Sequence, residues 1–393
     1  MIQVEEALSI IAAQSCQMPI RKIKVGKSLH YILAESIYSP IDMPPFRQSA
    51  MDGYAFKHSE LQQFKVVNTA QAGIFFNKKI NEDEAVRIFT GAFVPDDLDT
   101  VVMQEHTNRV DDSLEISKMP LCLANVRAKG EQVKKDELVL EKNTLITPAA
   151  IGFLAGLGIT ELLVYAKPKV AIVVTGNELV SSGKKLPKGK IYESNSIMLE
   201  AALSEMGISK IKKVRVKDNF HQTKKVLKDC LNKSDIVLVS GGISVGDYDF
   251  VMEALLQNGV QELFYKINQK PGKPLFFGKI KQTLVFALPG NPASALTCFF
   301  VYVYPALKIS MGFDAIHLPK IKRKIKTSFQ NTSGKSLFLK AFYDIDSVSV
   351  LESQSSAMLN TFALANALIF IPFDVERVEM NQEVIVIPIQ KQI

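Results

Sequence analysis

Residues 239–250, VSGGISVGDYDF, join a glycine-rich turn to two carboxylates. The apolar run DIVLVS precedes the turn, so we expect it at the carboxyl end of a buried strand, where ligands of open α/β sheets bind. Glycines let backbone N–H groups approach an anion, and a carboxylate beside a phosphate needs a divalent cation between them. A tight turn with an acidic helix cap also fits this pattern. The candidate residues are Gly241, Gly242, Ser244, Gly246, Asp247 and Asp249.

Three other predicted strands end in similar turns: TGNEL, VKDNF and LPGNPAS, at residues 175–179, 216–220 and 288–294. The carboxyl ends of parallel strands share one rim of a sheet, so we expect these side chains near one another. The segment KPGKP at 270–274 adds lysines. Carboxylates suit a hard cation and lysines suit an oxyanion. The rim residues are Glu178, Asp218, Lys266, Lys270, Lys273, Pro289, Gly290, Pro292 and Ser294.

The elements that must position these residues follow from periodicity. From residue 167 onward, buried strands alternate with helices of 10 to 15 residues, which predicts a mainly parallel α/β sheet. Residues 291–312 predict one long apolar helix. After Pro319 alternating runs such as SLFLKAFYDI predict a small β domain. Earlier in the chain, residues 44–128 contain turn signals and short β-type runs, between segments 1–43 and 129–165 that look like a connector.

The composition excludes several classes of protein. The chain has 393 residues, 47% hydrophobic and 22% charged, which indicates several globular domains. Its start lacks the features of a signal peptide, and the longest apolar run, 295–307, is too short for a membrane span, so we expect a cytoplasmic protein. The four cysteines are far apart, which predicts neither disulfides nor a zinc site. A net charge of +7 is mild, and we expect no nucleic-acid partner.

Two further motifs lie before the α/β region. SAMDGYA contains Asp52, and TGAFVP begins at Thr90. Together with TGNEL, SGGISVGDYD, KPGKP and LPGNPAS, they occur in the order of one family. The chain resembles the molybdopterin molybdenumtransferases, the MoeA family, which is related to the gephyrin E domain. The resemblance covers nearly the whole chain.

This resemblance implies a multidomain α/β fold. Its parts would be a molybdopterin-binding type α/β sheet domain at 166–317, an inserted β-rich domain at 44–128, an elongated connector domain at 1–43 and 129–165, and a C-terminal β-barrel-like domain at 318–393. It also implies a homodimer, with the active cleft between the α/β domain of one subunit and the inserted domain of the other.

The resemblance further implies insertion of molybdate into adenylylated molybdopterin, with Mg²⁺ as cofactor and release of AMP, in molybdenum cofactor synthesis. A transient contact with the adenylyltransferase that supplies this substrate is expected. Glu178, Asp218 and Asp249 would hold Mg²⁺. Asp52 and Thr90 look like the family's functional acid and hydroxyl. The residues expected to face molybdate are Lys270, Lys273, Ser294, Lys340 and Ser356, while Lys266 would contact phosphate.

The chain departs from the family pattern at Gln132, Lys340 and Ala357, where Asp, Arg and Gly are usual. Lysine keeps the positive charge of arginine but lacks the planar guanidinium that binds an oxyanion through two hydrogen bonds. Lysine at position 340 therefore predicts weakened handling of molybdate. Two alternatives remain: a nucleotide pyrophosphatase on the same α/β domain, and a pterin-binding scaffold without strong catalysis. The first should lack SAMDGYA and the C-terminal β domain, and the second usually has a fused domain or long linker.

Overall fold

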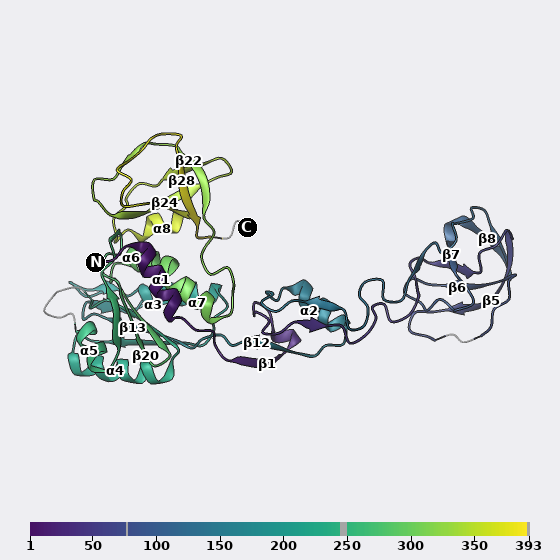
Figure 1. Cartoon of the computed structure of the whole chain (residues 1–393), viewed down its shortest axis with the longest axis horizontal. Coiled ribbons are helices and arrows are strands. Elements are labelled where there is room, and N and C mark those ends of the chain that lie inside the picture. The colour runs from purple at the N-terminus through teal and green to yellow at the C-terminus, as the bar shows by residue number, and fades with distance from the viewer. Residues whose placement is uncertain (76–77, 244–249, 391–393) are drawn as a thin grey trace. The chain divides into compact units, whose positions relative to one another are not determined.

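The computed structural model describes residues 1–75, 78–243 and 250–390 (Figure 1). The chain divides into two compact units. One unit comprises residues 1–21, 30–34 and 163–393, and the other comprises residues 22–29 and 35–162. The four-domain division expected from sequence is finer than this and remains a prediction.

The smaller unit is rich in β structure. Its six-stranded sheet has the order β7-β4-β6-β5-β9-β8, and β5 and β6 are its parallel pair. These strands are β4 (Gly53–Phe56), β5 (Gln63–Ala70), β6 (Glu84–Ile88), β7 (Thr100–Met103), β8 (Thr107–Val110) and β9 (Ser113–Ile116). Shorter elements complete it: η1 (Val25–Lys27), β2 (Ile37–Tyr38), β3 (Gln48–Ser49), η2 (Gln104–His106), β10 (Val126–Arg127), β11 (Leu138–Leu140) and α2 (Pro148–Gly156). The paired strands β1 (Ile20–Lys24) and β12 (Glu161–Tyr165) contain residues at which the chain passes between the two units.

The larger unit is built on a mixed sheet of order β16-β13-β17-β21-β20-β18. The four strands β16 (Ile211–Val216), β13 (Val170–Thr175), β17 (Ile236–Ser240) and β21 (Thr283–Leu288) are parallel, as predicted. The strand β20 (Phe276–Ile280) was not predicted, and it runs antiparallel to β21 and to β18 (Gln261–Tyr265). Gly278 interrupts the apolar pattern of this strand, so the sequence did not indicate a strand there. A Cβ there would lie 2.7 Å from the carbonyl oxygen of Gln261, so the strand pairing requires glycine.

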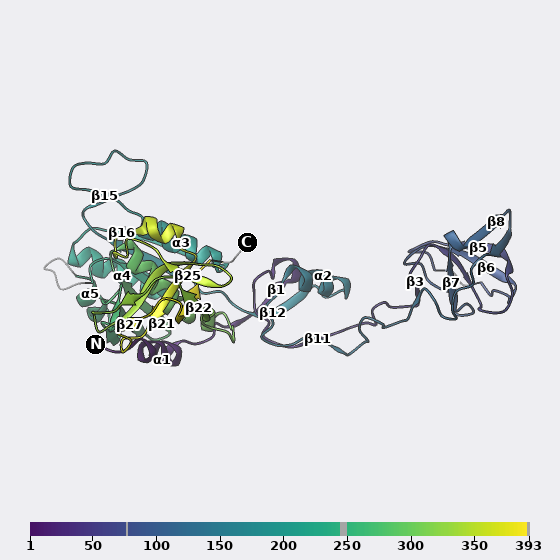
Figure 2. The ribbon, with the colours of Figure 1, turned by 90° about the horizontal axis from the view of Figure 1, so that it is seen from above.

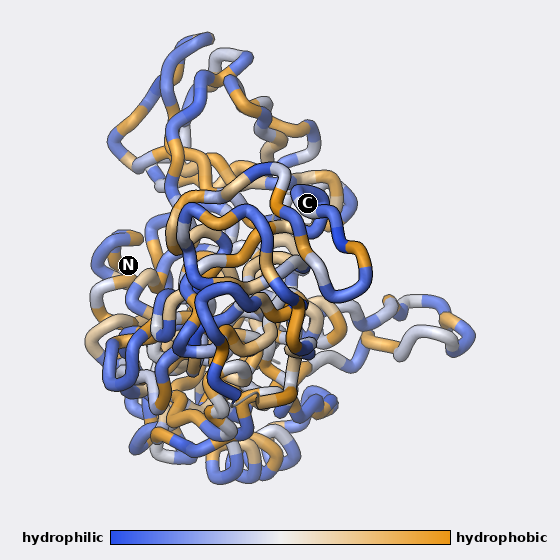
Figure 3. Tube along the Cα trace, turned by 90° about the vertical axis from the view of Figure 1, so that its right-hand side faces the viewer, coloured by the Kyte–Doolittle hydropathy of each residue, from blue (hydrophilic) through white to orange (hydrophobic). Residues whose placement is uncertain are grey.

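Helices cover both faces of this sheet, because alternate residues of a strand point to opposite sides. In β13, Ile172 packs with helices α1 (Val4–Gln14) and α3 (Asn195–Glu205), whereas Val173 packs with α4 (Phe220–Lys233) and α5 (Val251–Gln257). Such strands, buried on both faces, are near-continuous hydrophobic runs. The N-terminal helix therefore belongs to the α/β core (Figure 1), through Val4, Ala7 and Ile11. Several loops that project from the molecule are largely hydrophilic (Figure 3).

The predicted long apolar helix contains a π-helical turn. It runs as α6 (Pro292–Cys298), the π-helical η3 (Phe299–Val303) and α7 (Tyr304–Ser310). Proline at position 305 has no N–H to donate to the preceding turn, which favours a local change of hydrogen bonding there. Pro292–Ser310 is long and apolar enough to cross a membrane, but 67% of it is buried inside the structure, as in a core helix.

The last part of the chain closes into a barrel-like sheet of order β19-β24-β25-β22-β28-β26, with an additional β24–β26 pairing. Its elements are β22 (Ile321–Ile325), β23 (Phe329–Gln330), β24 (Ser336–Tyr343), β25 (Ser347–Val350), α8 (Leu359–Leu364), β26 (Ala367–Ile371), β27 (Arg377–Val378) and β28 (Glu383–Pro388). The strand β19 (Gln269–Lys270) joins this sheet from the middle of the chain, parallel to β24. The sequence-based fold class, including this β-barrel-like part, is confirmed.

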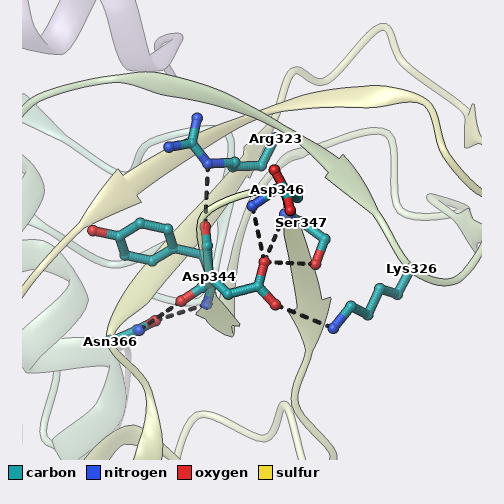
Figure 4. A network of polar contacts seen from close by, with 7 residues as sticks. Arg323, Lys326, Asp344, Asp346, Ser347 and Asn366 are labelled. Atoms are coloured by element: carbon teal, nitrogen blue, oxygen red, sulfur yellow. Dashed lines mark hydrogen bonds and ion pairs between the residues drawn. The ribbon is translucent and has the colours of Figure 1, made fainter.

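One turn of the barrel shows a dense polar network (Figure 4). Between β24 and β25 the carboxylate of Asp344 accepts hydrogen bonds from the amide and hydroxyl of Ser347, both at 2.8 Å, and from the amide of Asp346 at 3.1 Å. Lys326 forms an ion pair with it at 3.3 Å. These donors, the Ser347 hydroxyl first, hold the pKa of Asp344 well below its ordinary value.

Candidate functional site

A cavity of about 710 Å³ opens at the carboxyl ends of β13, β17 and β21. This is where parallel α/β sheets bind ligands, and the volume suits a small molecule. The predicted site residues that line it are Glu178, Asp218, Gly241, Gly242, Pro289, Gly290 and Pro292. Four separate strand-end turns, each about 20 to 50 residues after the one before it in the sequence, are thus brought to one place, which supports the rim inferred from the sequence.

The two predicted acids of the cavity follow neighbouring strands, because β13 pairs with β16, and a third acid, Glu193, also lines it. The carboxylate of Asp218 accepts a hydrogen bond from the amide of Asn177 at 2.8 Å, which joins the two loops. Glu178 folds back over Gly176, where an added Cβ would lie 2.7 Å from its carboxylate oxygens. Glycine at position 176 therefore lets this exposed carboxylate reach the cavity.

The glycines after β17 serve close packing. Gly241 and Gly242 have φ values of +91° and +64°, which favour glycine. A Cβ on Gly242 would lie 2.9 Å from the hydroxyl oxygen of Thr175, and one on Gly241 would lie 2.9 Å from the Thr175 carbonyl oxygen. The turn fits against the end of β13 for this reason, and its backbone lines the cavity as well. The residues Ser244, Gly246, Asp247 and Asp249 lie outside the described part of the chain.

Asn195 is a site residue that we did not identify from sequence. It is buried at the start of α3, and its side-chain amide donates to the Ser240 hydroxyl and the Gly290 carbonyl, both at 2.8 Å. It therefore ties three walls of the cavity together. The available signal was the polar YESNS run before a helix. Tyr192 of β15 (Ile191–Tyr192) also lines the cavity, at the foot of a lysine-rich loop that stands away from the sheet (Figure 2).

The lysine segment is held by a buried polar network. Gln269 is fully buried, and its amide donates to the carbonyls of Pro271 and Gly272 at 3.0 and 3.2 Å. The Tyr302 hydroxyl of the π-helical turn donates to the Gln269 side-chain oxygen. Lys270 and Lys273 extend exposed from this fixed loop. Pro274 lines the cavity, whereas none of the predicted lysines does.

The LPGNP turn connects the cavity to the barrel. The Asn291 side-chain amide donates to the Ser356 hydroxyl at 2.9 Å, and the adjacent Ala357 lines the cavity. Ser356 thus lies beside the LPGNP turn, and its role toward an oxyanion stays a prediction. Ser294 lies in the first turn of the long helix, and only 2% of its surface is exposed.

Comparison with known proteins covers the chain almost completely. Residues 2–158 match the MoeA N-terminal region (domain I and II), 171–309 a probable molybdopterin binding domain, and 322–389 the MoeA C-terminal region (domain IV). A molybdopterin molybdenumtransferase of Haemophilus influenzae is 35% identical over 93% of both chains, and one of Staphylococcus aureus strain COL is 33% identical over 94% of this chain and 91% of its own. The chain belongs to the MoeA family.

Solved structures agree with this assignment. Two structures of a molybdopterin biosynthesis MoeA protein from Pyrococcus horikoshii match with TM-scores of 0.84 and 0.81, at 29% and 28% identity. Each match covers at least 99% of this chain and all of the other. The MoeA-like multidomain fold, with its molybdopterin-binding type domain, therefore extends over the whole chain.

Asp52 and Thr90, which were predicted from the family motifs, lie in the smaller unit and contact each other directly. Asp52 accepts hydrogen bonds from the Thr90 amide at 2.7 Å and from its hydroxyl at 2.8 Å. These two donors, the amide first, lower the pKa of this exposed carboxyl. Arg87 was not singled out from sequence. It lies over the Tyr54 ring at 5.1 Å and donates to the Gly53 carbonyl at 2.7 Å, beside the acid.

Lys340 is placed differently from the expectation. Only 3% of its surface is exposed, and it is absent from the residues that line the cavity. Burial lowers the pKa of its ammonium group. We predicted that Lys340 faces an anion directly. Its position disagrees with this prediction, because protein encloses the side chain.

Proposed function

We propose that this protein is a molybdopterin molybdenumtransferase, which inserts molybdate into adenylylated molybdopterin and releases AMP. The observation that carries this proposal is the cavity: it combines the carboxylates of Glu178 and Asp218, a glycine turn and a proline-rich turn at the strand ends of a chain that matches the family along its length. No observation favours a pyrophosphatase or a scaffold. Both SAMDGYA and the C-terminal barrel are present.

The proposed substrate is an anion with an adenylyl phosphate joined to the pterin phosphate. During the reaction the bond to the adenylyl phosphorus breaks and AMP leaves, while dithiolene sulfurs replace oxygens of molybdate, which leave as water with the thiol protons. Water or molybdate oxygen takes the displacing role, so no protein nucleophile is needed. The protein binds the pterin in the cavity and places the phosphates beside Glu178 and Asp218.

We propose Mg²⁺ as the cofactor. Among the residues that the structure describes, no group of three His, Cys, Asp or Glu side chains is arranged to hold a metal. Glu178 and Asp218 still fit Mg²⁺, because this ion often uses one or two carboxylates together with substrate phosphates and water. Asp249 is the proposed third ligand. A bound ion would offset negative charge on the phosphate oxygens.

The proposed oxyanion site uses Lys270 and Lys273, because both extend from one fixed loop and ammonium groups suit molybdate oxygens. Ser356 and Ser294 are proposed as hydroxyl donors, and Lys266 as a phosphate contact. Asp52 and Thr90 are proposed to complete the site from a second subunit. We further propose that the protein is cytoplasmic and receives its substrate in a transient contact with the adenylyltransferase.

The test of the function is AMP release from adenylylated molybdopterin, measured with and without molybdate and Mg²⁺. We expect release that requires both and yields a pterin product containing molybdenum. Release that proceeds equally well without molybdate would instead indicate a pyrophosphatase, and no release at all would indicate a scaffold.

The homodimer is tested separately. Equilibrium sedimentation at micromolar protein should give about twice the chain mass of 43.6 kDa. An active monomer would contradict a site shared between subunits.

A further inference from the structure

Lys340 is a buried lysine whose ammonium group is fully engaged. It lies in β24, and its Nζ donates to the carbonyl oxygens of Ser353 at 2.8 Å, Met358 at 3.0 Å and Ser355 at 3.2 Å. An ammonium group has three N–H donors, so these three contacts use all of them. No donor remains for a bound anion while this arrangement holds.

The segment 353–358 encircles this lysine through further contacts. Gln354 accepts from the Lys340 amide at 2.9 Å and donates to the Lys340 carbonyl at 2.8 Å. It also donates to the Leu351 carbonyl at 2.7 Å. Ser353 has a φ of +59°, which a residue other than glycine adopts at a cost. The segment is therefore shaped around Lys340 rather than by its own backbone preferences.

The same segment reaches the candidate site. Ser356 accepts a hydrogen bond from the Asn291 side chain at 2.9 Å, which leaves its own O–H free to donate, and Ala357 lines the cavity. We infer that Lys340 is a positioning residue: it holds segment 353–358 so that the Ser356 hydroxyl faces an oxyanion at the cavity rim. The oxyanion is the molybdate of the proposed function, and the inference on its binding rests on that function.

Arginine should not replace Lys340 in this role. The three carbonyl oxygens surround one nitrogen, and the three N–H groups of a tetrahedral ammonium can each point at one of them. A guanidinium instead distributes its N–H donors over three nitrogens in one plane. A larger, planar group in this enclosed position would push the segment outward. Lys340→Arg should therefore weaken oxyanion binding, which is the opposite of the result expected if position 340 contacted the anion directly.

The first measurement is amide hydrogen exchange of segment 351–359 in the protein without ligand. Lys340→Met keeps the length of the side chain and removes its donors, so exchange should quicken by about 10- to 150-fold. Lys324→Met, at an exposed lysine of β22, is the matched control and should leave the segment unchanged. Unchanged exchange in Lys340→Met would overturn the inference. If Lys340→Met does not fold, Lys340→Arg replaces it.

The second measurement is molybdate affinity by calorimetry for Lys340→Met, Ser356→Ala and the double variant. If Lys340 acts through Ser356, the double variant should bind no more weakly than the weaker single variant. Additive losses, or tighter binding by Lys340→Arg, would show direct contact and overturn the inference. If wild type binds no molybdate, the proposed oxyanion site fails, while faster exchange in Lys340→Met would still support the holding role.

Discussion

The contact between Tyr302 and Gln269 allows a quantitative prediction. Tyr302 is fully buried in the π-helical turn, and its hydroxyl donates to the Gln269 side chain, which in turn holds the lysine segment. Tyr302→Phe removes one oxygen and keeps the ring, so packing should be preserved. The change leaves the Gln269 oxygen buried without this donor.

The magnitude follows from that orphaned oxygen. A buried acceptor that loses its partner costs about 1–3 kcal/mol. With a central value of roughly 2 kcal/mol and a urea slope of about 2–3 kcal/mol per molar, the unfolding midpoint should fall by about 0.7–1 M. The loosened segment should also raise the molybdate concentration needed for half-maximal AMP release, while binding of the pterin is unchanged.

Urea unfolding followed by circular dichroism measures this loss. Tyr304→Phe is the matched control, because Tyr304 begins α7, two residues after Tyr302, and the change also removes one tyrosine hydroxyl. Among the described residues, no hydrogen bond of the Tyr304 hydroxyl is found. Its midpoint should change much less. A Tyr302→Phe protein as stable as wild type, or no less stable than Tyr304→Phe, would refute the reasoning that this hydroxyl stabilises the segment.

Three more outcomes are expected. Lys273→Ala should weaken molybdate binding by about 10- to 150-fold in calorimetry, with pterin binding retained, and equal affinity would return this lysine to the solvated surface. Asp218→Asn should lower Mg²⁺-dependent AMP release on the order of 100-fold, and an unchanged rate would leave Asp218 as a loop contact. The lowered pKa of Asp344 means that its charge stabilises the fold above its ordinary pKa of 3.8, and that this contribution is lost as pH falls through the folded-state pKa. Asp344→Ala should therefore lower the melting temperature near neutral pH, and the difference from wild type should shrink in acid; a constant difference would contradict this.

Strand ends and turns were the most predictable part of the site. The buried strands before TGNEL, SGGIS and LPGNP are near-continuous hydrophobic runs, and parallel strands bring their carboxyl ends to one rim, so Glu178 and Asp218 could be placed together. A small C-terminal β domain was predictable from its alternating runs, whereas its barrel-like closure was implied only by the family resemblance. These features depend on patterns within short segments of the sequence.

Features set by distant contacts were not predictable. The apolar stripe of the first helix indicates an amphipathic helix but not its partner, which is the α/β core. Lys340 stands in an alternating strand, and the three carbonyls that enclose it come from residues 353–358, which have no periodicity of their own. The π-helical turn likewise depends on tertiary packing around Pro305 as well as on sequence.

The strand β19 has a consequence for exchange of modules between relatives. Although it lies in the middle of the α/β region, its Gln269 and Lys270 pair with Ser336 and Leu337 of the barrel, and Asn268 accepts from the Ser336 amide at 3.1 Å. On the other side of this segment, Asn268 donates to the Ile2 carbonyl at 2.8 Å. A chimera joined at the linker after α7, at residues 311–320, would therefore have to match the barrel not only at this junction but also at β19, which lies at residues 269–270. The barrel and the α/β sheet should be inherited, and replaced, together.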